Sequence, residues 1–432
     1  MLSKSYFSLL IFLISLSLFN CSKVDDFDEK NSEINESAIF EVTLDTQILN
    51  KYNPTEILKI LKAEDGYIIF INEQITTDDN VIRIIKINNE FSEQWSFSID
   101  ESKEYPERFA GVLELPNHEY IAILNTSKNY FGGIIRGEVY GLKFNNTGGF
   151  EWKKTYINKK NDYDNGFISH DYSLNFENDS NNLKFFILSD SIKNLTTIEQ
   201  YYKELTIDEN FNVLNEENFS FGSGSDYKFG NTKYHLNGNK YTYGDTWVID
   251  FIIGNEEHYS FQALILKYNP ENKLIYKNLF GIPERNEIFH DILIDNDKII
   301  TIGEHGDKSG LYLHHRYITQ LNESNGNLNW EIIADNPLFS GMYSSYIGRD
   351  ITVDEDGNYL ALFHESAVEG NCSTLAKINK QGKVLWTYLD STKQNMSTNT
   401  FFPYSIYTEK GEYLIFGLKE QNKIWIKKIK KS

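Results

Sequence analysis

Residues 378–390 read INKQGKVLWTYLD, and this stretch defines the repeating unit of the chain. It predicts the end of one β-strand, a tight polar turn at Gln381-Gly382, and a second strand that contains Trp386. The same step of eight residues, from an apolar residue to the position of the tryptophan, recurs along the chain, with one extra residue in one copy. The pairs are Ile87 and Trp95, Phe144 and Trp152, Ile207 and Asn215, Tyr268 and Tyr276, Leu321 and Trp330, and Ile378 and Trp386.

A second repeated feature precedes each of these units: a polar turn followed by a short apolar strand, as in EDGYIIFIN and EDGNYLALF. The first large residues of these strands are Tyr67, Tyr120, Leu183, Tyr241, Ile299, Tyr359 and Tyr413. The copies are spaced by roughly 50–60 residues, which is the range of four-stranded propeller blades with some long loops. We therefore count seven copies.

The seventh copy ends the chain without a last strand, and the segment AIFEVTLD (38–45) has the pattern of the missing piece. Phe40 is expected to take the place that Trp386 has in the sixth copy. Pairing of the first and last strands in one blade removes exposed sheet edges. The sequence thus predicts an all-β, seven-bladed β-propeller of four-stranded blades over residues 38–432, closed by an N-terminal strand in the last blade, with six or eight blades as the alternatives.

The first residues have the pattern of an export signal. Lys4 provides a positive start, and the apolar stretch Phe7–Phe19 is too short to span a bilayer as a helix. Leu18-Phe19-Asn20-Cys21 resembles the lipobox of bacterial lipoproteins, which implies a signal peptide over residues 1–20 and acylation of Cys21. The alternative is an ordinary cleaved signal with a chance cysteine.

Residues 21–37 are rich in acidic side chains and have little apolar surface to bury, so they are expected to form a tether. The run Val24–Glu29 resembles the acidic signal that directs Bacteroidota lipoproteins to the outer face of the outer membrane. The alternatives are a generic solvated spacer and the periplasmic face. The expected location is the outer membrane, lipid-anchored and facing the cell exterior, with the membrane as a partner through Cys21.

Composition excludes some partners. The chain has 432 residues and a net charge of −20, so nucleic acid is not expected to bind, because phosphate binding needs clustered lysine and arginine.

Cys372 is the only cysteine besides Cys21, so no intramolecular disulfide is possible once Cys21 is acylated. We expect Cys372 to be a partly buried, inert thiol.

The strand before each polar turn is expected to be the innermost of its blade and to line the axis. Three such strands carry similar polar pairs, and two others place an arginine or a tyrosine nearby; the residues are His170, Asp171, His290, Asp291, Arg349, Asp350, Arg108 and Tyr404. Together at one mouth they could bind an anionic or carbohydrate ligand. Alternatively, the pairs are structural and bond neighbouring blades to each other.

No catalytic or cofactor motif is present. The chain lacks a G-x-S-x-G elbow, a Walker loop and an H-E-x-x-H helix, and its histidine spacings match no zinc pattern. The acidic run Asp354–Asn358 is better explained as a turn than as a calcium loop, because the later acidic ligand is missing. We therefore expect neither a metal nor a cofactor.

The unit N-x-x-G-x-x-x-W resembles the repeats of PQQ-binding-like, quinoprotein-type β-propellers. This resemblance implies a propeller that serves as a binding or scaffold module; it does not extend to residues that would bind the quinone. The expected function is a surface-exposed lipoprotein that binds an extracellular glycan or protein without catalysis. The alternative is a glycan-active hydrolase or lyase with its site at the axial mouth, near His170, His290 and Arg349.

Overall fold

The computed structural model describes residues 39–76, 79–100, 107–115, 117–126, 139–156, 167–177, 182–194, 197–223, 227–235, 237–253, 256–281, 285–306, 314–334, 345–367, 370–392, 401–419 and 423–432. Cys21 and the proposed signal and tether lie outside these residues, and so do the side chains of some strand residues. Within the described part every regular element is a β-strand, and no helix is present that is long and apolar enough to cross a membrane.

The described residues form seven sheets of four antiparallel strands. Six sheets take four consecutive strands of the chain each. The first two contain β2 (Pro54–Ala63), β3 (Gly66–Thr76), β4 (Asp79–Asn88), β5 (Glu93–Ile99), then β6 (Glu107–Glu114), β7 (Glu119–Thr126), β8 (Val139–Asn145) and β9 (Phe150–Tyr156). The next two contain β10 (Phe167–Glu177), β11 (Asn182–Asn194), β12 (Thr197–Ile207), β13 (Val213–Ser223), then β14 (Tyr227–Tyr234), β15 (Lys240–Ile253), β16 (Glu256–Tyr268) and β17 (Leu274–Phe280). The following two contain β18 (Glu287–Asp295), β19 (Lys298–Gly306), β20 (His314–Asn322), β21 (Leu328–Ala334), then β22 (Ser345–Val353), β23 (Tyr359–Ala367), β24 (Gly370–Ile378) and β25 (Val384–Thr392).

The remaining sheet joins the two ends of the described chain. It contains β26 (Phe402–Glu409), β27 (Glu412–Lys419), β28 (Lys423–Lys431) and, paired with β28, β1 (Phe40–Gln47). Phe40 lies opposite Lys431 and Gln47 lies opposite Trp425. The expected pairing of residues 38–45 with the last strand is therefore present for the residues that the structure describes.

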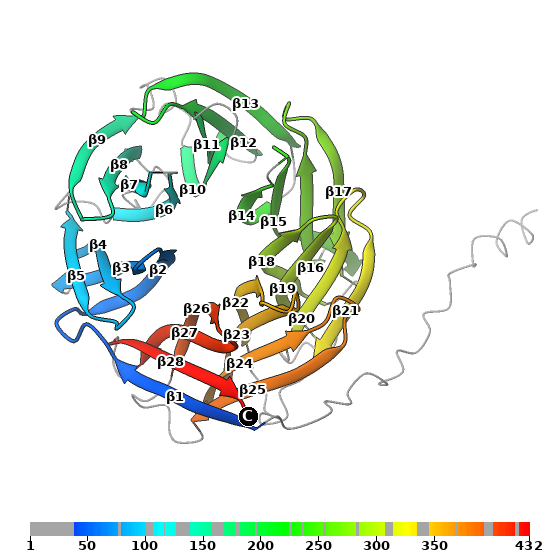
Figure 1. Ribbon diagram of the computed structural model, residues 1–432. Helices are drawn as coiled ribbons and strands as arrows, with labels where there is room; N and C mark the ends of the chain where they lie inside the picture. The colour runs from blue at the N-terminus through cyan, green and yellow to red at the C-terminus, as the bar shows by residue number, and fades with distance from the viewer. Residues whose placement is uncertain are drawn as a thin grey trace, which may run out of the picture. The chain divides into compact units, whose positions relative to one another are not determined.

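Each sheet contacts the next one along the chain, and β2 also contacts β26 and β27, so the first and last sheets are neighbours. The first strand of each sheet lies on the inner side of this cycle, and the fourth strand lies on the outer side (Figure 1). We call the end with the short turns between first and second strands the turn end. The other end, where each first strand begins, is the loop end.

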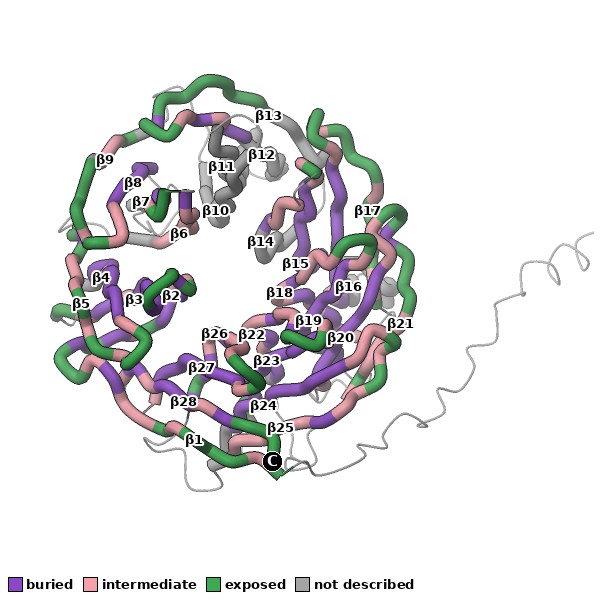
Figure 2. The backbone as a smooth tube through the Cα atoms, viewed as in Figure 1, coloured by how far each residue is buried: buried purple, intermediate pink, exposed green. Residues whose placement is uncertain are grey.

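Burial follows this layering. The second and third strands are mostly buried, whereas the outer strands alternate between half-buried and exposed residues (Figure 2). Neighbouring sheets share their cores; for example, Phe70 of the first sheet packs against Phe109 of the second, with ring centroids 5.0 Å apart. Aromatic pairs of this kind stabilise the contact beyond simple area burial.

The repeated Gly-to-Trp spacing has a structural cause, because the turn of one sheet covers the aromatic residue of the preceding one. A Cβ on Gly148 would lie 2.7 Å from the ring of Trp95, and a Cβ on Gly382 would lie 2.7 Å from the ring of Trp330. The indole of Trp95 also donates a hydrogen bond to the Asn146 carbonyl oxygen at 2.8 Å. Only glycine fits between ring and turn, and its positive φ at both positions suits it further.

The expectation for Phe40 is wrong. Trp386 pairs with Lys377, and the residue that pairs with the equivalent Lys428 in the last sheet is Leu44. β1 and β25 have the same irregularity, between Val42 and Leu44 and between Val384 and Trp386, so Phe40 lies four residues before the equivalent position, at the start of β1. There its ring packs against Trp386 of the preceding sheet, with centroids 5.0 Å apart.

Candidate functional site

The inner strands carry a β-bulge at matching places. The register shifts between Phe289 and Asp291 in β18, between Gly348 and Asp350 in β22, and between Pro403 and Ser405 in β26. The bulged residues are His290, Arg349 and Tyr404. A bulge leaves one residue without a ladder partner and changes the direction of its side chain, and bulges often occur beside functional sites. These three predicted residues therefore share one structural position.

The predicted residues of the second and third sheets are only partly described. His170 and Asp171 lie within the register shift of β10, but their side chains are outside the described part, as is the side chain of Arg108. In β6 the shift falls between Phe109 and Gly111, so Ala110 is the bulged residue. Arg108 therefore does not share the position of His290, which corrects the placement expected from the sequence.

His290 and Asp291 connect neighbouring sheets. The backbone N–H of Gly348 in the next sheet donates to Nδ1 of His290 at 2.9 Å. Oδ1 of Asp291 accepts the hydroxyl of Tyr243 at 3.1 Å and lies 2.6 Å from the ammonium of Lys233, both in the preceding sheet. These contacts fit the structural alternative considered for the polar pairs.

Asp350 has a similar connecting contact. Its Oδ2 accepts the backbone N–H of Ile406 in the next sheet at 2.9 Å. Burial raises the pKa of this carboxyl, and the negative charge of Asp291 raises it further, while Lys59 and Lys233 oppose the shift. Asp291 and Asp350 thus lie close enough to interact across two inner strands.

Arg349 and Tyr404 are brought together across the next boundary between sheets. The guanidinium carbon of Arg349 lies 5.1 Å from the centroid of the Tyr404 ring, which is within the range of a cation–π contact. Burial lowers the pKa of Arg349 and raises that of Tyr404. Nε of Arg349 is buried and has no hydrogen-bond partner among the described residues.

His364 completes this group, and the sequence did not single it out. It lies in β23, is 4% exposed, and packs its ring 4.5 Å from that of Phe402. Burial lowers its pKa to about 3, and the charge of Arg349 acts in the same direction, so the imidazole is neutral at physiological pH. Its Nδ1 is also buried without a partner in the described part of the chain.

A signal for His364 was present in the repeat. The last residue before the bulge of each inner strand pairs with a residue of the second strand, and the next residue of that second strand is His364 in the sixth sheet. The equivalent residues are Glu304 and Asp245 in the two preceding sheets. At this place the apolar run of the second strand gives way to a polar residue that is nevertheless buried. Burial raises the pKa of Glu304 to about 7, and the charge of Asp245 adds to the shift.

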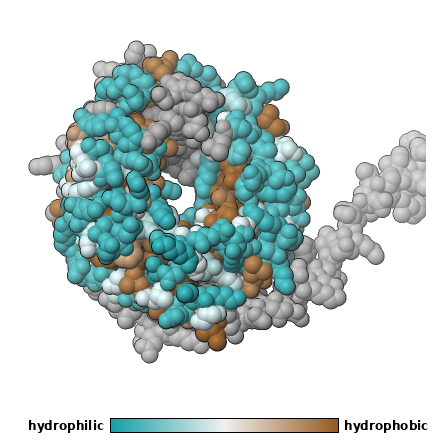
Figure 3. All heavy atoms as spheres, viewed as in Figure 1, coloured by the Kyte–Doolittle hydropathy of each residue, from teal (hydrophilic) through white to brown (hydrophobic). Residues whose placement is uncertain are grey.

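The residues around the group are exposed. Glu56, an exposed residue of β2, is near enough to influence the ionisation of Arg349 and Tyr404, although no ion pair forms between Glu56 and Arg349 in the described structure. The surface is hollowed in the middle of this unit and is bordered mainly by hydrophilic side chains, with one apolar stretch (Figure 3). A ligand could approach the inner strands from this hollow.

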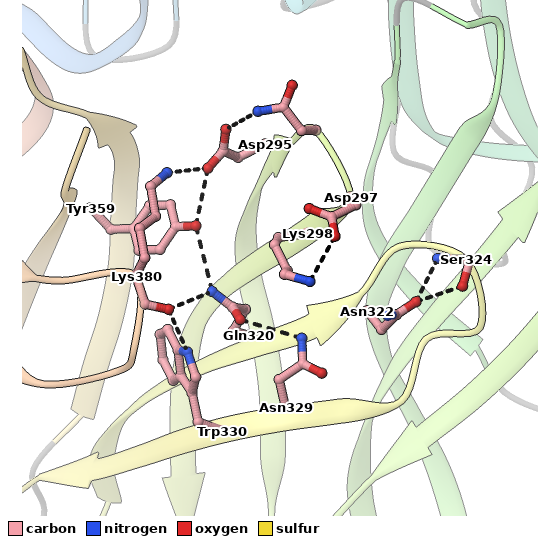
Figure 4. Close-up of polar contacts among 11 residues, drawn as sticks. Asp295, Asp297, Lys298, Gln320, Asn322, Ser324, Asn329, Trp330, Tyr359 and Lys380 are labelled. Atoms are coloured by element: carbon pink, nitrogen blue, oxygen red, sulfur yellow. Dashed lines mark hydrogen bonds and ion pairs between the residues drawn. The ribbon is translucent and has the colours of Figure 1, made fainter.

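The turn end is chemically different. The hydroxyl of Tyr359 donates to Asp295 Oδ2 at 3.0 Å, and the Lys380 ammonium pairs with the same carboxylate (Figure 4). The Lys380 carbonyl oxygen accepts hydrogen bonds from the Gln320 amide and the Trp330 indole, each at 3.2 Å. Polar groups in this network bond one sheet to the next.

Metal and thiol chemistry are not apparent in the described residues. No group of three or more His, Cys, Asp or Glu side chains there could bind a metal ion. Cys372 is free and 1% exposed, more deeply buried than the sequence indicated. Its thiol contacts include the Ser373 carbonyl oxygen and the Thr374 hydroxyl, both in its own strand.

Comparisons with known proteins identify the fold. No family model and no curated protein matches the chain. Among solved structures, it is similar to an ulvan lyase of polysaccharide lyase family 25, solved bound to -[GlcA(1-4)Rha3S]-, with a TM-score of 0.51, 10% identity, and coverage of 89% of this chain and 94% of that one.

Two other solved structures are similar as well. Raptor from Chaetomium thermophilum gives a TM-score of 0.50 at 8% identity, and 91% of this chain matches 30% of that one. The Dos1 propeller gives a TM-score of 0.46 at 8% identity, with coverage of 86% of this chain and 77% of that one. At such low identity these likenesses bear on the fold alone. The cycle of four-stranded antiparallel sheets in the described residues gives a β-propeller fold, and the similarity to the ulvan lyase at a TM-score of 0.51 agrees with it.

Proposed function

We propose that this protein is a lipid-anchored, seven-bladed β-propeller that binds an extracellular ligand at its axis. The seven described sheets would be the complete set of blades. Residues 1–20 would be the signal peptide, Cys21 the acylated residue, and residues 21–37 the tether that displays the propeller on the outer face of the outer membrane. The lipobox-like Leu18–Cys21 and the acidic run after it support this location.

The observation that supports an axial binding site is the state of Arg349. A half-buried guanidinium with a tyrosine face on one side and no carboxylate partner in the described structure is incompletely satisfied. Buried charges in proteins are normally paired, so an unpaired one that lies on an inner strand indicates a place for an anionic or hydrogen-bonding ligand group. Binding without catalysis is the simplest use of such a group.

The binding proposal is tested by screening the full-length protein in detergent against arrays of extracellular glycans and proteins. We expect at least one reproducible ligand whose binding is lost in Arg349→Met. Lys383→Met, which removes one positive charge from an exposed turn, is the matched control and should bind normally. Binding that is the same in both variants would place the ligand away from the axis.

The anchoring proposal has its own test. Cys21→Ala should release the protein from membranes into the soluble fraction, because several acyl chains on one cysteine would provide most of the membrane affinity. Protease added to intact cells should degrade the wild-type protein if it faces the exterior. Membrane retention of Cys21→Ala would show that something other than acylation attaches the protein.

A second candidate function is a lyase acting on acidic glycans. The specific support is a neutral imidazole, His364, beside a cation, Arg349. In β-elimination a base removes the proton α to a carboxylate, the C–O bond to the leaving sugar breaks, a C=C bond forms, and the leaving oxygen takes up a proton. Arg349 would neutralise the carboxylate, and an unprotonated His364 could accept the proton.

The similarity to an ulvan lyase in fold is in keeping with this alternative. It is tested by incubating the protein with acidic polysaccharides and following the ultraviolet absorbance of the unsaturated product. Absorbance that increases with wild-type protein and stays constant with His364→Phe would favour the lyase. Binding without any new absorbance would favour the binding protein.

A further inference from the structure

Arg349 and His364 lack the carboxylate partner that several other cationic and imidazole side chains of the described residues have. His305 lies 3.0 Å from a Glu287 carboxylate oxygen, and Arg83 pairs with Glu73. Arg349 Nε and His364 Nδ1 are buried without hydrogen-bond partners among the described residues, as are His305 Nδ1 and Arg316 Nε, but only the latter two have a carboxylate within 4 Å there. Arg349 follows Gly348, which pairs with Phe363, the residue before His364 in the adjacent strand, so the two side chains lie near each other. Each has a buried nitrogen without a hydrogen bond.

This state is energetically unfavourable unless something completes it. A buried polar group without a hydrogen bond has lost its hydration and has no protein interaction to offset that loss. The cost in free energy is larger for a charged group. Tyr404 covers one face of the Arg349 guanidinium, but a cation–π contact leaves the N–H groups in the guanidinium plane free to donate. His364 is 4% exposed, so solvent provides little hydration to its imidazole ring.

The charges point to an oxyanion of low charge. A guanidinium presents parallel N–H groups that match the two oxygens of a carboxylate. The neutral imidazole of His364 adds a hydrogen bond at Nδ1 without adding charge, so the group carries a single positive charge. The carboxylate of Glu56, which acts on the ionisation of Arg349, opposes a dianion such as a phosphate monoester.

Resting on the proposed axial binding site, we propose that Arg349 and His364 together bind the carboxylate of a uronic-acid residue in an extracellular glycan. Arg349 holds the carboxylate oxygens in the plane of its guanidinium, and His364 makes one further hydrogen bond through Nδ1. Tyr404 keeps the guanidinium in place by covering its face. A sugar is favoured over an acidic peptide because a single cationic residue suits one isolated carboxylate, whereas an acidic peptide presents several.

Glu56 then acts as a negative charge that competes with the ligand. It influences Arg349 and Tyr404 from the exposed side, without an ion pair to Arg349 in the described structure. Because Glu56 is exposed, solvent screens its charge and its effect is small. Glu56→Gln should therefore strengthen binding of a carboxylate, whereas changes that weaken Arg349 or His364 should weaken it.

The test measures binding of four probes to the full-length protein in detergent by calorimetry. The probes are an oligogalacturonate, its methyl ester, a sulfated neutral oligosaccharide and a poly-glutamate peptide. Wild-type protein should bind the oligogalacturonate and bind the methyl ester about tenfold to a hundredfold more weakly, which is the usual effect of losing a charged hydrogen bond.

Substitutions separate the contributions of Arg349 and His364 to binding. Arg349→Met should abolish the preference for the acid over the ester, and Arg349→Lys should restore only part of it, because an ammonium cannot form the planar double contact. His364→Phe should weaken binding about tenfold, and His364→Asn should recover part of the loss, because its amide lies near the place of Nδ1. Glu56→Gln should bind roughly two- to threefold more tightly. Lys383→Met is the control, and circular dichroism shows whether each variant is folded.

The outcomes separate this inference from the proposed function. If oligogalacturonate binds the wild-type protein and the Arg349 and His364 variants with equal affinity, the carboxylate subsite is rejected. The binding function would then lie elsewhere on the propeller. Tighter binding of the sulfated sugar would overturn the carboxylate assignment, and tighter Arg349-dependent binding of poly-glutamate would overturn the sugar. Failure of the wild-type protein to bind any glycan or protein on the arrays would reject the proposed function itself.

Discussion

The two ends of the sheets use the same strands for different purposes. At the turn end, charged and phenolic groups are paired across sheet boundaries, as with Tyr359 and Lys380 on Asp295. Towards the loop end, Arg349 and His364 have buried polar atoms without partners in the described structure. The difference is local, because His290, Asp291 and Asp350 bond neighbouring sheets at the level of Arg349. The turn-end network joins sheets, whereas the group of Arg349 and His364 keeps polar atoms available. The experiments below test that contrast, beginning with the largest expected effect.

The strongest test of the turn end is to remove one partner of a buried ion pair. Lys240 Nζ lies 2.5 Å from Glu204 Oε2, and the side chains are only 1% and 4% exposed. Lys240→Met leaves the Glu204 carboxylate buried without the ammonium, although the Asn272 amide still donates to Oε1 at 3.3 Å. We therefore expect a loss of about 3–5 kcal/mol in the free energy of unfolding, measured with guanidinium chloride.

The double variant Lys240→Met/Glu204→Leu is the control, because it removes the Glu204 carboxylate as well. It should recover most of the lost stability. If the single and double variants are equally unstable, packing around Lys240 matters more than its charge, and the pairing at the turn end is less important than we infer.

A titration tests the loop end. The pKa of Glu304 is raised to about 7 in the folded protein from an ordinary value of 4.5, so the folded state retains a proton that the unfolded state releases. Stability contributed by this carboxyl is therefore present at low pH and declines as the pH rises from about 4.5 through 7. Glu304→Gln should remove this decline, which is on the order of 3 kcal/mol.

The measurement is the free energy of unfolding of both proteins across that pH range. His364 contributes in the opposite direction, since its depressed pKa makes the folded protein less stable as the pH falls below its ordinary value of 6.5. The difference between wild-type protein and Glu304→Gln at each pH cancels this second effect. A difference that does not change with pH would contradict the raised pKa.

Two turn glycines test how tightly neighbouring sheets are packed at the turn end. Gly382 and Gly357 have similar positive φ values, 83° and 79°. A Cβ on Gly382 would lie 2.7 Å from the Trp330 ring, whereas a Cβ on Gly357 would meet nothing within 4 Å. We expect Gly357→Ala to cost about 1 kcal/mol from backbone strain alone and Gly382→Ala roughly 1–3 kcal/mol more.

Thermal unfolding of the two variants provides the measurement, and Gly357→Ala is the control for strain. Equal destabilisation would mean that Trp330 moves aside at little energetic cost. The close fit between the turn of one sheet and the ring of the other would then not stabilise the boundary between them.

The smallest effect is expected from one hydroxyl. Tyr359→Phe removes the hydrogen bond to Asp295 at 3.0 Å and leaves the ring in place, so it should destabilise the protein by about 1 kcal/mol. Tyr388→Phe is a matched control, because no hydrogen bond from its hydroxyl is present in the described structure. Similar losses in both variants would show that the network at the turn end adds little.

Much of the fold could be predicted from the sequence, because strands and turns depend on local patterns. Tyr67, Tyr120 and Tyr359 were expected to start the strand after a polar turn, and each lies in the second strand of its sheet. Register could not be predicted as well. Leu44 has the place expected for Phe40, and Ala110 the place near which Arg108 was expected, because register and bulge position depend on the partner strand and not on local pattern alone.

The site was less predictable. Arg349 and Tyr404 were selected from their places in the repeat, and the structure brings them within 5.1 Å. His290, Asp291 and Asp350 were selected by the same reasoning, but they bond neighbouring sheets. His364 was not selected, since its neutrality and its missing partner arise from burial against Phe402 and not from any motif.

By itself, the sequence determined the repeating four-strand unit, because alternating apolar runs and glycine or asparagine turns impose strand length and direction through short-range sterics. Only the tertiary structure decided which polar side chains have partners. Whether a charge is satisfied depends on the sheet beside it, as with Lys240 and Glu204, which are far apart in the chain and 2.5 Å apart in space. The buried atoms of Arg349 and His364 that lack hydrogen bonds among the described residues depend in the same way on the arrangement of neighbouring strands.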